Sequence, residues 1–260
     1  MKPLILISND DSVYAKGIKE LVEIAKQFGE VVVVAPDKPQ SAKSHSVTLG
    51  APIMYKKITR FGDIEAYKCT GTPADCVKIA LFTILKRKPD LILSGINHGA
   101  NYSVNLLYSG TVAAAVEGAL HNIPSIALSI DSHESEADFT LAKKYSTEII
   151  EKTLQNGLDD KICLNVNIPD IELEQAKGIK ICRQTKGVWA EDFIERKHPT
   201  IPFSYHWLTG KFHNQEPDNQ ETDVWAIDNN YAAIVPLQID LTSYKMLDKM
   251  KNNWKFYNNI

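Results

Sequence analysis

Two adjacent carboxylates follow an apolar run near the start of the chain. Leu4–Ile7 is wholly apolar, and Asn9, Asp10 and Asp11 stand just beyond it. Four consecutive apolar residues are typical of a parallel strand that is buried on both faces. Neighbouring ionised carboxylates repel each other, and a bound cation removes that repulsion. The stretch is therefore a candidate metal site at a strand end, and a solvated turn rich in Asn and Asp is the alternative.

Two further segments supply polar side chains after apolar strands. They are Ser41 and His45 in the loop 36–48, which follows a strand at 31–35, and Asn97 and Asn101 in the loop 95–103, which follows a strand at 89–94. Because open α/β sheets bind ligands at the carboxyl ends of their strands, we expect the three loops to converge on one edge. Carboxylate, hydroxyl and amide oxygens suit Mg²⁺ or Mn²⁺. For most of 36–48, an ordinary surface loop is the alternative.

A helix made of small residues opens with Ser109, Gly110 and Thr111. The first N–H groups of a helix lack intrahelical partners and can bind an anion such as phosphate. Capping of the helix by Ser or Thr is the plainer interpretation, and both can hold together. A metal beside an anion site indicates metal-assisted phosphoester hydrolysis. We expect the hydroxyls to serve substrate, so that Thr111→Val lowers kcat/KM and leaves metal affinity unchanged.

The order of elements indicates the fold class. Helices are expected at 17–29, from Thr72 onward, at 108–118 and at 137–154, and further strands at 124–130 and 162–168. Alternating strands and helices predict an α/β fold with a doubly wound, mostly parallel sheet of the Rossmann-like kind over residues 1–170. Segments around 51–69 are expected to form short antiparallel strands.

The character of the chain changes beyond residue 170. Short strands or hairpins are expected at 179–183, 203–212, 222–227 and 231–237, and a terminal helix at 245–251. We interpret residues 171–260 as a C-terminal extension with antiparallel hairpins. Because it is aromatic-rich and long, we expect it to serve oligomerisation, in a homodimer or homotetramer.

The composition limits the function classes. The chain has 260 residues, of which 44% are hydrophobic, so it can bury a sizeable core. A formal net charge of -3 does not favour binding to a nucleic-acid polymer or a membrane surface. No apolar run reaches the ~20 residues of a membrane span, and the N-terminus has no signal-peptide pattern, so we expect a cytoplasmic protein. The four cysteines form no Cys-x-x-Cys pair and are expected to be reduced and buried.

Five motifs in order resemble the SurE (stationary-phase survival) nucleotidase family. They are Asn9-Asp10-Asp11; Ala35-Pro36-Asp37 with Ser41 and His45; Gly71-Thr72-Pro73-Ala74-Asp75; Ser94-Gly95-Ile96-Asn97-His98-Gly99 with Asn101; and Tyr108-Ser109-Gly110-Thr111-Val112 with Glu117-Gly118. Each motif alone is weak, but their order and spacing are specific. The resemblance runs from Leu4 to about Ile130 and continues more weakly beyond.

The resemblance implies a metal-dependent phosphatase that acts on nucleoside 5′- and 3′-monophosphates. The implied ligands of one Mg²⁺ or Mn²⁺ ion per subunit are Asp10, Asp11, Ser41 and Asn97. The implied reacting groups are Asp10, Asp11, Asn9 and His45, and the implied substrate contacts are Asn101, Ser109, Gly110 and Thr111. For His45, proton transfer or phosphate contact and a structural hydrogen bond remain open alternatives.

The chain departs from the family pattern at three positions. Ser12 replaces the usual Gly after the acidic pair, and Ser103 and Asn105 replace the usual Gly and Asp before Tyr108. The ligand positions are unchanged, so the departures concern loop shape and substrate preference.

Other protein classes share parts of this pattern. A receiver-type signalling domain also has an acidic pair after its first strand, but it needs an Asp at the end of the third, where this chain has Ser94. A phosphatase with a covalent aspartyl intermediate needs an exposed nucleophile, usually in an Asp-x-Asp arrangement, whereas Asp10 and Asp11 are adjacent. A non-catalytic nucleotide-binding module remains the third alternative.

Overall fold

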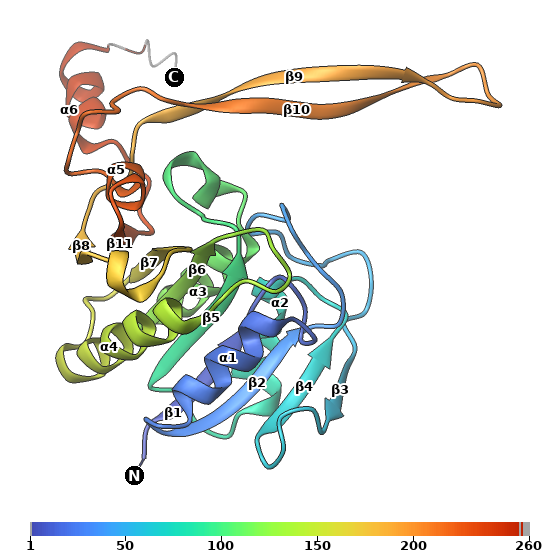
Figure 1. Ribbon diagram of the computed structural model, residues 1–260, viewed down its shortest axis with the longest axis vertical. Coiled ribbons are helices and arrows are strands. Elements are labelled where there is room, and N and C mark those ends of the chain that lie inside the picture. The colour runs from blue at the N-terminus through green and yellow to red at the C-terminus, as the bar shows by residue number, and fades with distance from the viewer. Residues whose placement is uncertain (1, 255, 257–260) are drawn as a thin grey trace.

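The computed structural model describes residues 2–254 and 256 of the chain (Figure 1). Its main sheet has nine strands: β1 Leu4–Ser8, β2 Glu30–Pro36, β3 Tyr55–Ile58, β4 Glu65–Cys69, β5 Leu91–His98, β6 Ser125–Asp131, β7 Ile162–Pro169, β8 Gly178–Ile181 and β11 Tyr231–Gln238. Their spatial order is β3-β4-β2-β1-β5-β6-β7-β11-β8.

Most neighbouring strands of this sheet are parallel. The parallel pairs run without interruption from β4 through β2, β1, β5 and β6 to β7. The edge strand β3 is antiparallel to β4, and β11 is antiparallel to β7 but parallel to β8. The prediction of a doubly wound, mostly parallel α/β sheet is confirmed.

Helices cover both faces of the sheet. The helices are α1 Lys16–Ala25, α2 Pro73–Ile79, α3 Gly110–Leu120, α4 Thr140–Asn156, α5 Asp223–Asp228 and α6 Tyr244–Asn253, with short helical turns at Ala80–Ile84, Ser103–Leu107 and Leu173–Gln175. Of these, α6 buries no residue and does not cover the sheet (Figure 1). Ile18, Leu21 and Val22 of α1 join residues of α4 in one buried cluster. The core residues of α2 and α3 lie in two other clusters, against the opposite face. No described helix is long and apolar enough to cross a membrane.

The chain reverses its winding direction at β1. This strand lies between β2 and β5, so the sheet grows one way through β2 and the other way through β5. At such a switch point, the loops after the two central strands separate and leave a crevice at their carboxyl ends. The acidic pair follows β1 directly, and therefore lies at this crevice.

Three local expectations differ from the structure. Residues 222–227 were expected to be a strand, but Thr222 caps the helix α5 by accepting from the backbone N–H of Trp225. Residues 95–98 were expected to be loop, but they complete β5. β4 pairs in parallel with β2 as well as antiparallel with β3, so the region 51–69 is only partly antiparallel.

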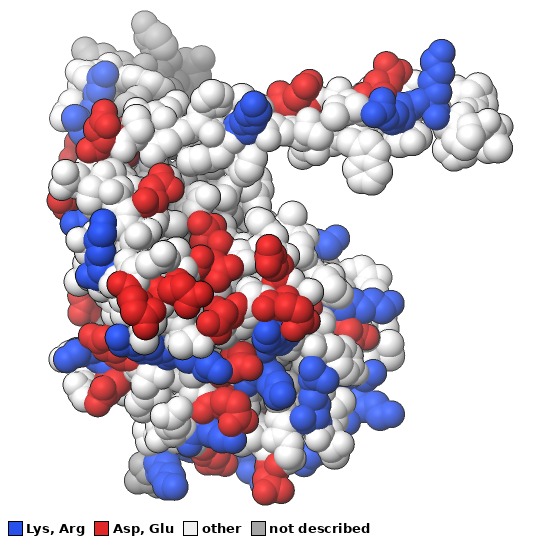
Figure 2. Space-filling view, in the orientation of Figure 1, with Lys and Arg blue, Asp and Glu red and all other residues white. Residues whose placement is uncertain are grey.

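A long hairpin stands apart from the main sheet. It consists of β9 Gly187–Lys197 and β10 Ser204–Asn214, which pair antiparallel over their whole length. It projects as an arm, with an open recess between it and the body (Figures 1 and 2). The predicted hairpin extension is thus present, although β8 and β11 join the main sheet. The division of the chain at residue 170 stays a prediction.

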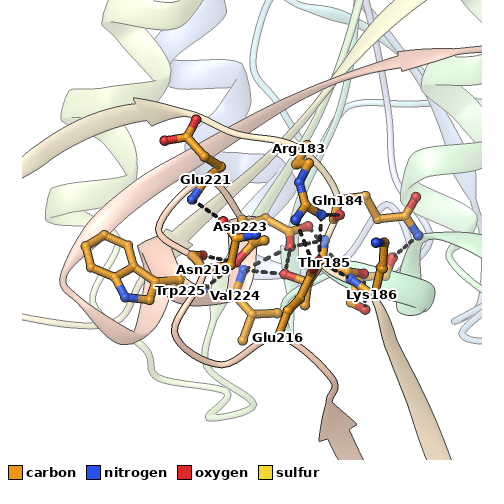
Figure 3. A network of polar contacts seen from close by, with 12 residues as sticks. Arg183, Gln184, Thr185, Lys186, Glu216, Asn219, Glu221, Asp223, Val224 and Trp225 are labelled. Carbon is orange, nitrogen blue, oxygen red and sulfur yellow. Dashed lines mark hydrogen bonds and ion pairs between the residues drawn. The ribbon is translucent and has the colours of Figure 1, made fainter.

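A buried carboxylate ties the base of the arm to the body (Figure 3). Asp223, fully buried at the start of α5, accepts from the backbone N–H of Ser103 at 3.0 Å and of Thr185 at 2.9 Å. The hydroxyl of Thr185 donates to the same carboxylate at 2.5 Å. Hydrogen bonds to an ionised acceptor are stronger than neutral ones. One side chain therefore joins the turn at Ser103, the segment before β9 and α5.

We predict that Asp223→Asn destabilises the fold, because an amide cannot accept from all these donors and leaves buried N–H groups unpaired. The expected loss is about 2–4 kcal/mol of unfolding free energy, or roughly 5–15 °C in Tm. Differential scanning calorimetry measures it. Glu221→Gln, an exposed neighbour in the same loop, is the matched control, and equal melting of the two variants would contradict the assignment.

Candidate active site

The acidic pair lies on a turn that a buried amide holds in place. Asn9, which is fully buried, donates from Nδ2 to the carbonyl oxygen of Ser12 at 2.8 Å. Its Oδ1 is buried and has no partner among the described residues. Because buried polar atoms are normally satisfied, this oxygen is available to a group bound at the crevice.

Asp10 is the most enclosed acid of the site, with 4% of its surface exposed. The hydroxyl of Thr111 donates a hydrogen bond to its carboxylate. The pKa of Asp10 is raised to about 6, chiefly by burial and also by the charge of Asp11, while the bond from Thr111 opposes this shift. Gly110 packs against the same side chain, since a Cβ there would lie 2.8 Å from the Cβ of Asp10. The start of α3 is thus built around this carboxylate.

Asp11 is tied to the end of β5. Its Oδ2 accepts from the backbone N–H of His98 at 3.0 Å and lies 3.5 Å from Nδ1 of the same residue. In the sequence, His98 belongs only to the expected loop 95–103 and was not a candidate site residue. Asp11 and His98 are 87 positions apart in the sequence, so no local pattern predicts their contact. The only hint in the sequence is that His98 directly follows Asn97.

Asn97 brings an amide to the same crevice. It is 9% exposed, and its Nδ2 donates to the carbonyl oxygen of Gly99 at 2.6 Å. This bond directs the nitrogen into the loop. The described hydrogen bonds leave Oδ1 without a donor, so it can face a cation.

Ser41 lies in an exposed part of the loop that follows β2. The residue before it, Gln40, donates its backbone N–H to the carbonyl oxygen of Asp10 at 2.7 Å. The loop therefore touches the acidic pair, but no hydrogen bond of Ser41 itself appears among the described residues. Its role as a ligand stays a prediction.

Asn101 is anchored by the strands β6 and β7. Its backbone N–H donates to Asn167 at 2.7 Å, its Nδ2 donates to Ser129 at 2.9 Å, and its carbonyl oxygen accepts from Asn165 at 2.8 Å. All three partners are fully buried. This cluster explains why polar residues interrupt the buried strands β6 and β7.

The N-terminus of α3 is capped as the plainer interpretation expected. The hydroxyl of Ser109 accepts from the backbone N–H of Val112 at 3.1 Å. The hydroxyl of Thr111 serves Asp10, which differs from the expectation that it serves substrate alone. Among the described hydrogen bonds none uses the N–H of Gly110, which leaves one donor for an anion.

His45 lies beside a buried glutamate. Its Nε2 is 2.9 Å from Glu117, which also accepts from Lys78 at 2.6 Å and lies 3.2 Å from Nε2 of His121. Burial raises the pKa of Glu117, but the bonds from His45 and Lys78 outweigh it and bring the pKa to about 2. The ionised carboxylate stabilises the fold above pH ~4.5, and this contribution is lost as the pH falls toward ~2. No described contact joins His45 to the acidic pair, and its catalytic role stays a prediction.

A pocket of 470 Å³ joins the crevice to the arm. On the body it is lined by Asp10, Asn101 and Ser109, and on the arm by Trp189, Glu191 and Leu208. Pockets of about 300–1,000 Å³ are typical of small-molecule sites. The sequence did not predict that the arm lines this pocket. The two strands of the arm are distant from the acidic pair along the chain, and their sequence does not indicate where the arm lies.

The donor set of the crevice fits a hard divalent cation. Two adjacent carboxylates, a hydroxyl and amide oxygens are the ligands that Mg²⁺ and Mn²⁺ prefer. Among the described residues, no three His, Cys, Asp or Glu side chains gather as a metal cluster. The predicted set contains only two such residues, so the fit depends on its amide and hydroxyl oxygens. Two further observations agree with a bound cation. The Oδ1 of Asn9 has no partner among the described residues, and the buried charge of Asp10 is only partly balanced by its surroundings.

Fold and site together define a doubly wound α/β protein with a carboxylate and amide site at its switch point. The sequence profile of the family described as Survival protein SurE matches residues 5–191. The chain belongs to this family.

Relatives and a solved structure agree with this membership. A protein named 5'-nucleotidase SurE from Phocaeicola vulgatus is 47% identical over 251 residues, covering 96% of both chains. One of the same name from Flavobacterium johnsoniae is 47% identical, covering 98% of this chain and 97% of its own. The crystal structure of the SurE protein from Aquifex aeolicus has a TM-score of 0.83 at 39% identity and covers 96% of this chain and 99% of that one.

Two departures from the family pattern fall where glycine is favoured. Ser12 has φ of 89° and Ser103 has φ of 51°, both in the left-handed region. The third departure, Asn105, accepts from Nε1 of Trp189 at 2.8 Å. This chain therefore keeps the glycine-like backbone with serine and uses Asn105 to hold a residue of the arm.

We predict that Thr111→Val weakens both metal binding and turnover, because Asp10 loses the hydroxyl that orients it. A residue that supports a metal ligand typically contributes about ten- to a hundredfold in metal affinity or activity. Calorimetric Mn²⁺ titration without substrate, kcat/KM and Tm are measured on the same variant.

Thr140→Val is the control for Thr111→Val. It also removes a threonine hydroxyl that donates to an aspartate, but this aspartate, Asp138, is exposed and lies outside the site. A lowered Tm with unchanged metal affinity and kcat/KM would reduce Thr111 to a structural residue.

Proposed function

We propose that this protein is a metal-dependent phosphomonoesterase that hydrolyses nucleoside 5′- and 3′-monophosphates. The observation that carries the proposal is the meeting of the acidic pair, the amide of Asn97 and the start of α3 in one crevice. Relatives that carry the name 5'-nucleotidase SurE match nearly the whole chain, which places it among the 5′-nucleotidases. Beyond this, we propose metal dependence and action on 3′-monophosphates.

The ligands proposed for one Mg²⁺ or Mn²⁺ ion are Asp10, Asp11, Ser41 and Asn97. Such an ion, when bound, lowers the pKa of its water and polarises phosphoryl oxygens. Thr111 orients Asp10, and the backbone of His98 orients Asp11, so both carboxylates are preorganised.

Substrate phosphate is proposed to bind at the start of α3. The N–H of Gly110 and the partial positive charge of the helix end favour an anion there. Ser109 and Asn101 line the same pocket as Asp10 and can contact the phosphate or ribose. Asn9 shapes the turn of the acidic pair. His45 is retained as a candidate for proton transfer or phosphate contact.

Partners and location complete the proposal. The substrate is a nucleoside monophosphate, and we expect no nucleic-acid polymer or membrane as a partner. A cytoplasmic location remains a prediction. A non-catalytic nucleotide-binding or receiver-like signalling role is the alternative, but β5 has Ser94 where a receiver needs its phosphorylated Asp.

We predict that Asp10→Asn and Asp11→Asn each abolish phosphate release while the fold persists. Loss of one ligand charge weakens both metal binding and the activation of water. Phosphate release is measured across 5′- and 3′-monophosphates with Mg²⁺, Mn²⁺ and chelator.

Asp63→Asn, in the exposed turn between β3 and β4, is the control for these variants. Full activity of either site variant at limiting metal would contradict the assigned ligands. Release by the wild type that persists in chelator would contradict metal dependence itself, and no release with any metal would favour the alternative.

We also propose a homodimer or homotetramer that uses the arm. Its apolar side chains include Phe193, Ile194 and Trp207, which are 59%, 41% and 64% exposed. Contiguous exposed apolar surface typically marks an interaction site. Deletion of residues 192–209 with a short turn in their place should shift the mass measured by analytical ultracentrifugation to a smaller species. An unchanged mass would show that the arm does not hold the assembly.

A further inference from the structure

The arm contributes one chemically distinct half of the site pocket. Asp10 and Ser109 line its inner end, while Trp189, Glu191 and Leu208 line its outer end. The inner end offers carboxylate and hydroxyl groups suited to metal and phosphate. The outer end offers an indole, an apolar side chain and a single carboxylate. A ligand that spans both must have an anionic end and a flat, partly apolar end.

The strand register places these outer residues on one face of the arm. Trp189 is opposite Phe212, Glu191 is opposite Gly210, and Phe193 is opposite Leu208. Directly opposed residues of an antiparallel pair project from the same face. Trp207, opposite Ile194, belongs to the other face. Trp189, Glu191 and Leu208 therefore reach the pocket from one face of the arm.

The indole of Trp189 is fixed in orientation but not covered. Its Nε1 donates to Asn105 at 2.8 Å, and its ring packs edge-on against Phe212 with centroids 6.0 Å apart. Even so, 38% of the residue is exposed. The polar N–H is satisfied, so what remains available is ring surface. Ring surface held rigidly in a pocket is suited to stacking a planar heterocycle.

Glu191 lines the same pocket as this ring. Its partner across the strands, Gly210, has no side chain to cover it. No hydrogen bond or ion pair of the Glu191 carboxylate occurs among the described residues. An ionised carboxylate only accepts hydrogen bonds. It therefore favours a ligand edge that presents adjacent N–H donors.

We propose that Trp189, Glu191, Gly210 and Leu208 form the nucleobase subsite of the enzyme, and that Glu191 makes it prefer guanine. The base stacks on Trp189, and the carboxylate accepts from the N1–H and N2–H groups of guanine. Adenine and cytosine present a ring acceptor next to their amino group, and uracil presents one N–H between two carbonyls. The proposal rests on the proposed function, because it assigns the base end of that substrate.

The test compares nucleotides with a base-free substrate. The variants Trp189→Leu, Trp189→Phe and Glu191→Gln are assayed with Mn²⁺ on GMP, AMP, UMP and ribose 5-phosphate. Trp189→Leu should lower the ratio of kcat/KM for GMP to that for ribose 5-phosphate by roughly ten- to a hundredfold, the size of one base–aromatic stack. Trp189→Phe should restore most of that ratio.

Glu191→Gln tests the choice of base. The wild type should prefer GMP to AMP, and the variant should lower that preference by about tenfold, the usual size of one paired contact to a base edge. Glu195→Gln, farther along the same face of the arm, is the matched control and should leave both ratios unchanged. Analytical ultracentrifugation should show that every variant keeps the assembly of the wild type.

Two results would overturn the subsite. One is an equal loss on GMP and ribose 5-phosphate in Trp189→Leu, which marks a structural role. The other is a GMP to AMP ratio that is the same in Glu191→Gln and wild type. Calorimetric binding of GMP in chelator separates this proposal from the proposed function: if the wild type releases no phosphate, weaker GMP binding by Trp189→Leu still supports the subsite, and equal binding refutes it.

Discussion

The buried negative charge of Asp10 is the constraint on which the rest of the site depends. A carboxylate that is 4% exposed and next to Asp11 needs compensation from its surroundings. The start of α3 supplies part of it through Thr111, and that contact requires the helix to approach closely. Gly110 meets the side chain of Asp10, and at Gly118 a Cβ would lie 2.2 Å from the hydroxyl oxygen of Ser125. The small residues of α3 are therefore a requirement of the site as much as of the core.

The same helix also holds the loop that carries Ser41 and His45. Glu117, two turns beyond Thr111, draws His45 toward α3, while the backbone N–H of Ser44 donates to the carbonyl oxygen of Tyr108 at 2.9 Å. Together with the bond from Gln40 to Asp10, these contacts fix both ends of the exposed segment. An exposed hydroxyl at Ser41 is thus presented by a fixed backbone, which limits the conformational entropy that is lost when it binds a ligand. One helix orients the acid and anchors the loop opposite it.

The features that could be predicted from the sequence were those set by local residue patterns. Apolar runs located the central strands, and the rule for carboxyl ends placed Asp10, Asp11 and Asn97 at one edge. The helix α5 was missed because its six residues are too few for a periodic signal, although Thr222 is an ordinary cap. The partner of Thr111 lies 101 positions away, and Trp189 reaches the pocket only through a hairpin whose direction no local pattern specifies. The roles of these side chains depend on long-range contacts, which local sequence patterns do not predict.

The site is consequently assembled from two parts that are held differently. Its inner end is fixed by the parallel sheet and by buried amides such as Asn165 and Asn167, so changes there disturb the core. Its outer end belongs to an arm whose attachment depends on Asp223 and its bonds to Ser103 and Thr185. The side chains of the arm that face the pocket make few contacts with the sheet. Substitutions on that face can therefore alter which ligand is accepted while the geometry of the acidic pair stays the same. On the proposals made above, the chemistry depends on the sheet and the selectivity depends on the arm.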